Sequence, residues 1–459
     1  MSTHRKLPKV ALLGASLLAV FVALQCVRPE LTNPPVLADL EAPTPVKEIL
    51  RTACYNCHSN ETRLPWFDQV VPAYWLVARD VKRGRAALNF SDFSRLPTSK
   101  QKALLYESIN QVRLGAMPPR AYSRVHPEAV LDAPRIELIE KYLHPAEPVE
   151  ESSLEQVAAA TRQYEAWSSS VAPHASVPPA PNGLPFFSDY ANWKAVSTTD
   201  RFDNHTLRLV LANDIAERAI AAHQIQPWPD GSAFAKVAWD QLVAADGTVQ
   251  PGAFKQVEFM LKNAQKYAAT EGWGFGRWLG SGHEPYGKAP DFDRECTGCH
   301  APMARNDFVY TLPITASHAE ESADLFNTRA ALATSLSFQP LDWRVITLGS
   351  DLRHNSMFTL FGNDVAVDHA RTAPNLPYPM GAVLARVVWA EQDDAHWFGA
   401  RIAGAVASVE FVEFTAGSDA GTAVRYSEFA GASLAPVRTT EAPSLLAAPI
   451  LRLRASILP

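Results

Sequence analysis

The cysteines of this chain lie almost entirely in two short motifs of the same form. The sequence CYNCH occupies residues 54–58, and CTGCH occupies residues 296–300. Together they contain four of the five cysteines in the 459-residue chain. Each motif separates two thiols by two residues and ends with a histidine directly after the second thiol. Such a group can form disulfides, bind a metal ion, or attach and ligate a haem.

Three interpretations of the two motifs compete. Disulfides within each pair would close strained local loops, and a chain of this length does not need such cross-links. A four-cysteine zinc site is possible in principle, but the pairs lie about 240 residues apart, far from the spacing of a zinc ribbon. Haem c fits both motifs, because each cysteine pair can form two thioethers while the adjacent histidine binds the iron. We therefore predict two covalently bound haems c, attached through Cys54, Cys57, Cys296 and Cys299, with His58 and His300 as iron ligands.

The N-terminal segment predicts export from the cytoplasm. Basic residues precede an apolar run from Val10 to Leu24, which is typical of an export signal. A good cleavage site is missing, and continuing the run through Val27 brings it close to the roughly 20 residues that span a bilayer. We therefore predict a membrane anchor over residues 1–28. The rest of the chain would lie on the periplasmic side of a bacterial inner membrane, or be exported if the segment is cleaved.

The residues after the first motif predict a small all-α domain. Apolar side chains recur at helical spacing in the segments 75–88, 100–112 and 132–143. The ordered motifs ACYNCHSNETRLPWF, DVKRGRAALNFSDF and GAMPPRAY resemble the haem-binding domain family of bacterial anchored cytochromes. This resemblance implies a monohaem, cytochrome c-like helical domain, which we assign to residues 29–145.

A methionine on a proline-rich loop is a candidate for the sixth ligand of the first iron. Met117 lies in RLGAMPPR, about 60 residues after His58. Closing both axial positions of the iron would make an electron-transfer haem, and a Met/His pair raises its potential. His126 lies close by in the sequence and is the rival ligand.

Beyond a linker at residues 146–185, rich in proline, serine and alanine, the chain repeats itself at an offset of 150 residues. NWKAVSTTDRFDNH at residue 192 aligns with DWRVITLGSDLRHN at 342, and PWPDGSAFAKVAWD aligns with PYPMGAVLARVVWA. Alternating apolar residues between Gly, Pro, Asn and Asp favour strands. We therefore predict two mainly antiparallel β domains in tandem, at residues 186–318 and 338–459.

The first β domain resembles cytochrome P-460 and its relative cytochrome c-prime beta. The matching residues are DGSAFAK, VEFMLKNAQKY, GWGF and ECTGCHAPMARNDFVYT, in this order. In P-460 members a lysine is joined covalently to a meso carbon of the porphyrin, and the resemblance implies that Lys236 takes this place. It also implies that Glu258 corresponds to the carboxylate above the open iron face in hydroxylamine-oxidising members.

The residues themselves leave both roles open. Lys236 lies in the apolar alternation AFAKVAW, where a lysine either points outward or has a specific inward partner. Desolvation would lower its pKa and make it a usable nucleophile. The second β domain has Arg386 at this position and no cysteine, so we expect it to be a structural or dimerisation copy. Its Glu410 resembles Glu258, which favours a structural role for Glu258 over that of a base.

Two classes of function follow from these motifs. As an enzyme, the second haem would oxidise hydroxylamine or a related small nitrogen compound, and the first haem would pass electrons to an acceptor redox protein. As a binding module, the second haem would capture nitric oxide at an open side of the iron. Met303 lies too close to His300 in the chain to reach that side, and an open haem site binds small gases. A plain electron-transfer cytochrome is a third alternative, and a homodimer is compatible with each. The net charge of −6 does not indicate the basic surface that a nucleic-acid partner would require.

Overall fold

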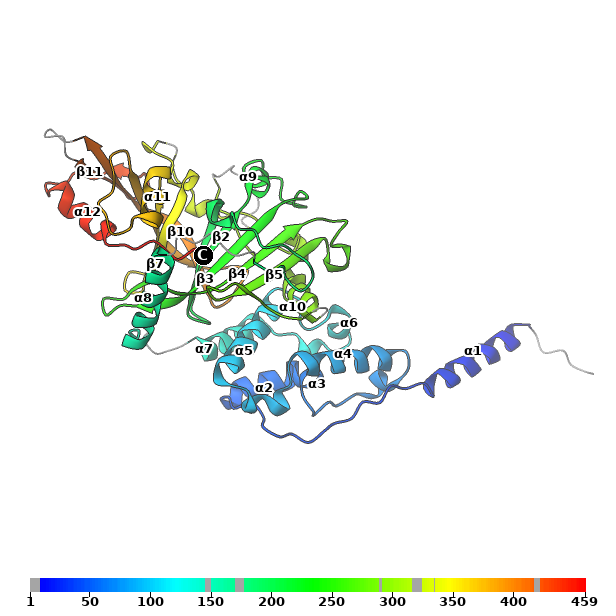
Figure 1. The fold of residues 1–459 in the computed structure, drawn as a ribbon. Coiled ribbons are helices and arrows are strands. Elements are labelled where there is room, and N and C mark those ends of the chain that lie inside the picture. The colour runs from blue at the N-terminus through cyan, green and yellow to red at the C-terminus, as the bar shows by residue number, and fades with distance from the viewer. Residues whose placement is uncertain are drawn as a thin grey trace, which may run out of the picture. The chain divides into compact units, whose positions relative to one another are not determined.

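The computed structural model of the protein has two compact units, Met1–Pro145 and Ala146–Pro459. The first unit is helical, and the second is built around a large antiparallel sheet (Figure 1). The structure describes residues 9–144, 150–169, 177–288, 291–315, 324–333, 335–416 and 422–459.

The helical unit has a core made by apolar residues from several helices. Leu50, Val81, Ile109 and Ile139 are buried and come from four different helices. The spacing of apolar residues predicted helices at 75–88, 100–112 and 132–143, and helices α4, α5 and α7 lie there. The α-helices of this unit are α1 (Lys9–Gln25), α2 (Thr44–Ala53), α3 (Tyr55–His58), α4 (Ala73–Ala87), α5 (Thr98–Arg113), α6 (Arg120–Ser123) and α7 (Ala133–Leu143).

The predicted membrane anchor is wrong. Helix α1 has 17 residues, which span about 26 Å at 1.5 Å per residue, less than the roughly 30 Å of a hydrocarbon core. The helix ends at Gln25, whose side-chain amide pairs with the backbone of Val71 at 2.9 and 3.2 Å. The apolar run therefore does not continue as a helix to Val27. Among the residues that the structure describes, no helix is long and apolar enough to cross a membrane.

The second unit contains two sets of elements in the same order, which we call the first half (β1 to β6) and the second half (β7 to β12). In both, a helix follows the second strand and begins at an asparagine cap. The side-chain oxygens of Asn213 and Asn363 each accept a 3.0 Å hydrogen bond from a backbone N–H in the first turn. The strands are β1 (Lys194–Arg201), β2 (Thr206–Ala212), β3 (Ala233–Val243), β4 (Thr248–Lys262), β5 (Trp273–Leu279), β6 (Glu284–Pro285), β7 (Arg344–Asp351), β8 (Ser356–Gly362), β9 (Val383–Asp393), β10 (Ala400–Ala416), β11 (Thr422–Ala430) and β12 (Ala435–Pro436). The helices are α8 (Leu154–Ser169), α9 (Asp214–Ala221), α10 (Asp291–His300), α11 (Asp364–Thr372) and α12 (Pro443–Leu451).

The two halves share one sheet instead of forming two separate sandwiches or barrels. Strand β4 of the first half pairs with β7 of the second, where Val249 lies opposite Ser350. Strand β1 pairs with β10, where Thr199 lies opposite Ile402. These reciprocal pairings resemble an isologous interface within one chain, and they close strands β1–β4 and β7–β10 into a ring. Pairing satisfies backbone groups that separate sheets would leave exposed at their edges.

Two faces of this sheet bury different clusters of apolar residues. The inner cluster contains residues of both halves, among them Trp239, Phe259, Trp389 and Phe411. In the first half, the opposite face packs against α9 and α10, and Phe234 belongs to that second cluster. In the second half, the opposite face packs against α11 and α12. Successive side chains of β3 therefore alternate between the inner cluster and the face covered by α10.

The junction between the halves contains a buried polar group that should make stability depend on pH. Burial, together with the charge of Asp200, raises the pKa of Glu391 to about 7, although Arg401 lies 2.9 Å away. Because the pKa is higher in the folded state than in the unfolded chain, the free energy of unfolding should fall as the pH rises from about 4.5 to 7. The variant Glu391→Gln should not show this fall with pH. Its free energy of unfolding at pH 8 should exceed that of wild type by an amount on the order of 2 kcal/mol. Urea unfolding at pH 5 and pH 8 tests this, and equal effects at both pH values would contradict it.

Candidate haem sites

Two backbone carbonyls engage one ring nitrogen of the histidine in the first motif. His58 ends α3, and its Nδ1 lies 3.0 Å from the carbonyl oxygen of Gly84 and 3.2 Å from that of Leu88. A proton on Nδ1 satisfies these carbonyls and leaves Nε2 as the nitrogen that could bind a metal. Burial lowers the pKa of His58 against the opposing effect of the two carbonyls, which keeps the ring neutral.

The four motif cysteines are available for attachment. None of them is joined in a disulfide. Burial raises the pKa of Cys54 to about 12, that of Cys57 to about 11 and that of Cys296 to about 12. These thiols are therefore protonated at neutral pH. The donor set of each motif, two thiols and one neutral imidazole, fits covalent haem.

Helix α4 approaches the first motif so closely that only glycine fits at the contact. A Cβ atom at Gly84 would lie 2.6 Å from the carbonyl oxygen of Cys57. The carbonyl group of Gly84 is also one of the acceptors for His58. Gly84 therefore sets both the position of α3 and the orientation of the histidine.

We expect Gly84→Ala to reduce haem attachment at the first motif. The added methyl group must push α3 away from α4, which should also lower the free energy of unfolding by about 1–3 kcal/mol. The haem content per chain and the melting temperature measure the two effects. Gly14→Ala is the matched control, because Gly14 is also helical and a Cβ atom there meets nothing within 4 Å. Equal haem content in both variants would rule out this role.

The two candidate sixth ligands of the first iron differ in how their polar atoms are engaged. His126 is buried, with Nε2 2.8 Å from Asp68 and Nδ1 3.1 Å from Glu128. Both ring nitrogens therefore face carboxylates. Met117 lies on the loop between α5 and α6, and 38% of its surface is exposed. This arrangement favours Met117 over His126 as the ligand.

In the first half of the sheet, three charged residues form a row across neighbouring strands. Lys236 on β3 lies opposite Glu258 on β4, which in turn lies opposite Arg277 on β5. The ammonium group of Lys236 contacts the Glu258 carboxylate, and Nε of Arg277 lies 3.1 Å from it. Phe234, two residues before Lys236, packs in the same cluster as Cys296 of α10. The row therefore lies on the face of the sheet that α10 covers.

Cations outnumber carboxylates in this row. Burial would raise the pKa of Glu258, but the charges of Lys236, Arg277 and Arg208 outweigh it and hold the pKa well below its usual range. Burial lowers the pKa of Lys236, and the charge of Glu258 only partly opposes this. Burial also lowers the pKa of Arg208 to about 9. Glu258 is thus ionised at neutral pH, and Lys236 loses its proton more readily than an exposed lysine.

The histidine of the second motif is held in the same way as that of the first. His300 ends α10, and its Nδ1 lies 2.7 Å from the carbonyl oxygen of Phe308. Its ring contacts Phe275 and Tyr310, with centroid distances of 5.1 and 5.3 Å. Burial lowers its pKa to about 4. Nε2 is therefore the nitrogen left for iron, and the ring is neutral.

The second half of the sheet keeps a similar ion pair without an attachment motif. Arg386 lies opposite Glu410 in the register, with Nε 2.5 Å from the carboxylate. The hydroxyl group of Tyr426 donates to the same carboxylate at 2.7 Å. Helix α12, PSLLAAPIL, packs Ala447 and Ile450 into the cluster on this face. It has no cysteine or histidine with which to hold a haem.

Sequence reasoning missed two residues of the site, Arg208 and Arg277. Both interact electrostatically with Glu258. Each interrupts an apolar strand, LRLVLAN or GWGFGRWL, just as Lys236 interrupts AFAKVAW. A cation that interrupts the apolar residues of a strand was therefore a usable signal in all three strands. The pairing of the strands, which sequence alone did not supply, is what brings the residues together.

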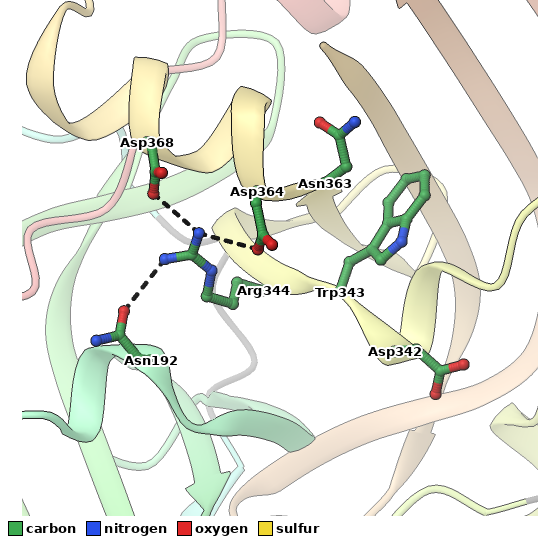
Figure 2. Close-up of a pocket in the computed structure, with 7 residues that line it drawn as sticks. All are labelled: Asn192, Asp342, Trp343, Arg344, Asn363, Asp364 and Asp368. Carbon is green, nitrogen blue, oxygen red and sulfur yellow. Dashed lines mark hydrogen bonds and ion pairs between the residues drawn. The ribbon is translucent and has the colours of Figure 1, made fainter. Parts of the chain in front are cut away.

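A separate surface pocket lies where β1 and β7 begin, and it has a different character. Figure 2 shows Arg344 between Asp364 and Asp368 on one side and Asn192 on the other, with donor–acceptor distances of 2.9–3.1 Å. The pocket has a volume of about 670 Å³. Its lining is Asn192, Asp342, Trp343, Arg344, Asn363, Asp364 and Asp368. Asp364 and Asp368 are ion-pair partners of Arg344. The third carboxylate, Asp342, pairs with Lys194 at 3.0 Å. We assign this pocket no role in haem binding.

Comparison with protein families finds one match over each of the two motifs. Residues 19–145 match the haem-binding domain, and residues 187–311 match cytochrome P460. A search of the curated proteins finds no match. The matches define the protein as a haem cytochrome. The chain joins a haem-binding domain to a cytochrome P460 domain, which confirms the fusion predicted from the sequence.

Proposed function

We propose that the protein is a dihaem c-type cytochrome whose P460 domain oxidises hydroxylamine or a related small nitrogen compound. The helical unit would receive the electrons and pass them to an acceptor redox protein. The observation that most supports this proposal is the row of Lys236, Glu258 and Arg277 on the face of the sheet covered by α10. We also propose a periplasmic location, because haem c is attached outside the cytoplasm.

Each motif would hold its haem through two thioethers and one histidine. His58 and His300 support this, because a backbone carbonyl engages Nδ1 of each ring and leaves Nε2 for the iron. The bound haem would supply the iron that takes up and releases electrons. Met117 would close the first iron against substrate and make it an electron carrier, whereas His126 is engaged by two carboxylates.

Lys236 and Glu258 would act in sequence at the second site. The lowered pKa of Lys236 makes the neutral amine easier to form than in an exposed lysine. This amine would replace the hydrogen of a porphyrin meso carbon, and the two electrons and two protons released would pass to an added oxidant of the peroxide class. A lysine joined in this way would no longer bring its ammonium charge to Glu258. Because that charge is the largest of those that hold down the pKa of Glu258, its loss would make the carboxylate a stronger base. Glu258 could then accept protons as electrons leave the nitrogen of the substrate.

Mass spectrometry of the tryptic haem peptides from the full-length holoprotein tests this proposal. It should show two haem peptides, and the peptide that contains Lys236 should travel with the second. The variant Lys236→Ala should lose this linkage, any unusual red-shifted absorption and the reduction of an acceptor by hydroxylamine. Lys255→Ala is the matched control on the adjacent strand, because Lys255 is 45% exposed and pairs with Asp240. Ordinary haem c spectra and no electrons from hydroxylamine in the unaltered protein would exclude the enzyme.

A nitric oxide-binding protein is the second candidate. The salt bridge between Lys236 and Glu258 favours it, because a lysine held as an ammonium by a carboxylate is protected from forming a covalent bond. A free Lys236 in the holoprotein, with nitric oxide binding and no turnover of hydroxylamine, would support this function. The second half of the sheet would then be a copy of the first half that serves as its internal partner.

A further inference from the structure

A loop of the second half is anchored on the first half of the sheet. This loop, residues 394–399, connects β9 and β10. The indole N–H of Trp397 donates to Asp203 at 3.0 Å, and the backbone N–H of Asp203 donates to the carbonyl oxygen of Gly399 at 3.2 Å. The guanidinium of Arg201 lies over the Trp397 ring, 4.5 Å from its centroid. These contacts hold the loop against residues 201–203 of the first half.

The same loop contacts the chain that follows the second motif. His396 is only 3% exposed, and its Nδ1 lies 2.7 Å from the carbonyl oxygen of Tyr310. Its Nε2 lies 3.5 Å from the side-chain amide of Asn306. The ring of Trp397 packs edge-on against Tyr310, with centroids 5.6 Å apart. The loop thus touches both ends of the segment 306–310.

That segment also holds the candidate iron ligand. The carbonyl group of Phe308 accepts the hydrogen bond from Nδ1 of His300 at 2.7 Å. The hydroxyl group of Tyr310 donates to the carbonyl oxygen of Cys299 at 2.7 Å, and its ring contacts the imidazole. Asp307 and Phe308 have φ values of 47° and 66°, which non-glycine residues adopt only at a cost. The Phe308 carbonyl therefore points toward Nδ1 of His300 only while neighbouring residues stabilise this backbone conformation.

The segment is held between the two halves of the sheet. On the side of the first half, Nζ of Lys262 lies 2.6 Å from the carboxylate of Asp307, which also accepts the backbone N–H of Trp228 at 2.9 Å. On the side of the second half, His396 and Trp397 are the contacts. Removing either side should loosen the geometry of the Phe308 carbonyl.

We propose that His396 and Trp397, supplied by the half without an attachment motif, are positioning residues for His300. They fix the segment whose Phe308 carbonyl sets the tautomer of His300 and its strength as an electron donor to iron. The half without the motif thus contributes two residues that position His300 in the second haem site. This inference rests on the proposed attachment of haem to Cys296 and Cys299.

The test uses the full-length holoprotein with His396→Ala. A weaker hydrogen bond from His300 makes the ring a poorer donor, which should move the midpoint potential of the second haem to a more positive value. The iron–histidine stretching band of the reduced protein in resonance Raman should move to lower frequency. The first haem should keep its potential. His354→Ala, also in the second half but with a side chain 76% exposed, should change neither quantity.

A second substitution separates the hydrogen bond from general disruption of the loop. His396→Asn keeps an N–H donor for the Tyr310 carbonyl and should restore most of the wild-type potential and band position. Trp397→Phe keeps the ring contact with Tyr310 and loses only the bond to Asp203, so it should lie between wild type and His396→Ala. If His396→Ala does not accumulate, these two variants decide the matter. An asparagine variant with a shift at least as large as that of Trp397→Phe would contradict the hydrogen-bond role.

The outcomes also distinguish this inference from the proposed function. A wild-type protein without covalent haem on the second motif would overturn the assignment of the haem, and the inference with it. Haem on that motif, with wild-type potential and Raman band in His396→Ala, would overturn the inference alone. The P460 assignment of residues 187–311 would stand in both cases.

Discussion

A variant in which Cys296 and Cys299 are both serine should keep one covalently bound haem per chain, on the helical unit. It should also lose all reduction of an acceptor by hydroxylamine. Serine cannot form a thioether, and His300 alone would have to hold a non-covalent haem. The two motifs lie in separate compact units, so the helical unit should fold and load its own haem unchanged. The haem-to-protein ratio and the mass of the intact chain measure the first effect.

The reciprocal variant, with serine at Cys54 and Cys57, is the matched control. It should also hold one haem, but with the absorption spectrum of the second site. Substrate should still reduce this haem in a single turnover, whereas steady-state transfer to a redox protein should fall because the carrier haem is missing. Two retained haems in either variant would contradict attachment at these motifs. Full turnover in the reciprocal variant would remove the relay role of the helical unit.

The two cysteine–histidine motifs could be recognised from sequence as candidate haem sites because their chemistry is local. Two thiols and a histidine within five residues predict a haem site wherever the chain places them. The same holds for the helices of the first unit, whose apolar periodicity is a short-range signal. The prediction failed at the N-terminus for a non-local reason. Helix α1 stops where the Gln25 amide pairs with Val71, and this contact joins residues 46 positions apart in the chain.

The partners of Lys236 could be predicted only in part. The resemblance to cytochrome P-460 singled out Lys236 and Glu258, but the register that sets them opposite each other and opposite Arg277 comes from strand pairing. The joining of the two halves into one sheet was likewise not predicted, because alternation marks strands without choosing their neighbours. Nor could the sequence show that His396 lies beside Tyr310, 86 residues away.

Glu258→Gln should lower hydroxylamine oxidation by roughly 100- to 10,000-fold if the carboxylate accepts protons during turnover. The amide keeps the volume and can still accept hydrogen bonds from Lys236 and Arg277, but it cannot take up a proton at neutral pH. In the protein without haem, where Lys236 is not joined to porphyrin, the amide also leaves these cations without a counter-charge. Because the side chains are partly exposed, we expect a loss of about 1–3 kcal/mol in the free energy of unfolding.

Glu410→Gln in the second half separates the catalytic effect of Glu258 from the structural one. Glu410 pairs with Arg386 in the corresponding register, so its replacement should cost similar stability and leave turnover unchanged.

The pH dependence of the unfolding free energy gives a further check on Glu258. Since the pKa of Glu258 is depressed in the folded state, its contribution to stability is complete above the ordinary carboxyl range and is lost as the pH falls below it. The difference in unfolding free energy between wild type and Glu258→Gln, both without haem, should therefore be constant from pH 7 to about 5 and shrink at lower pH. Equal turnover in Glu258→Gln and Glu410→Gln would show that the carboxylate beside Lys236 serves only to balance its charge.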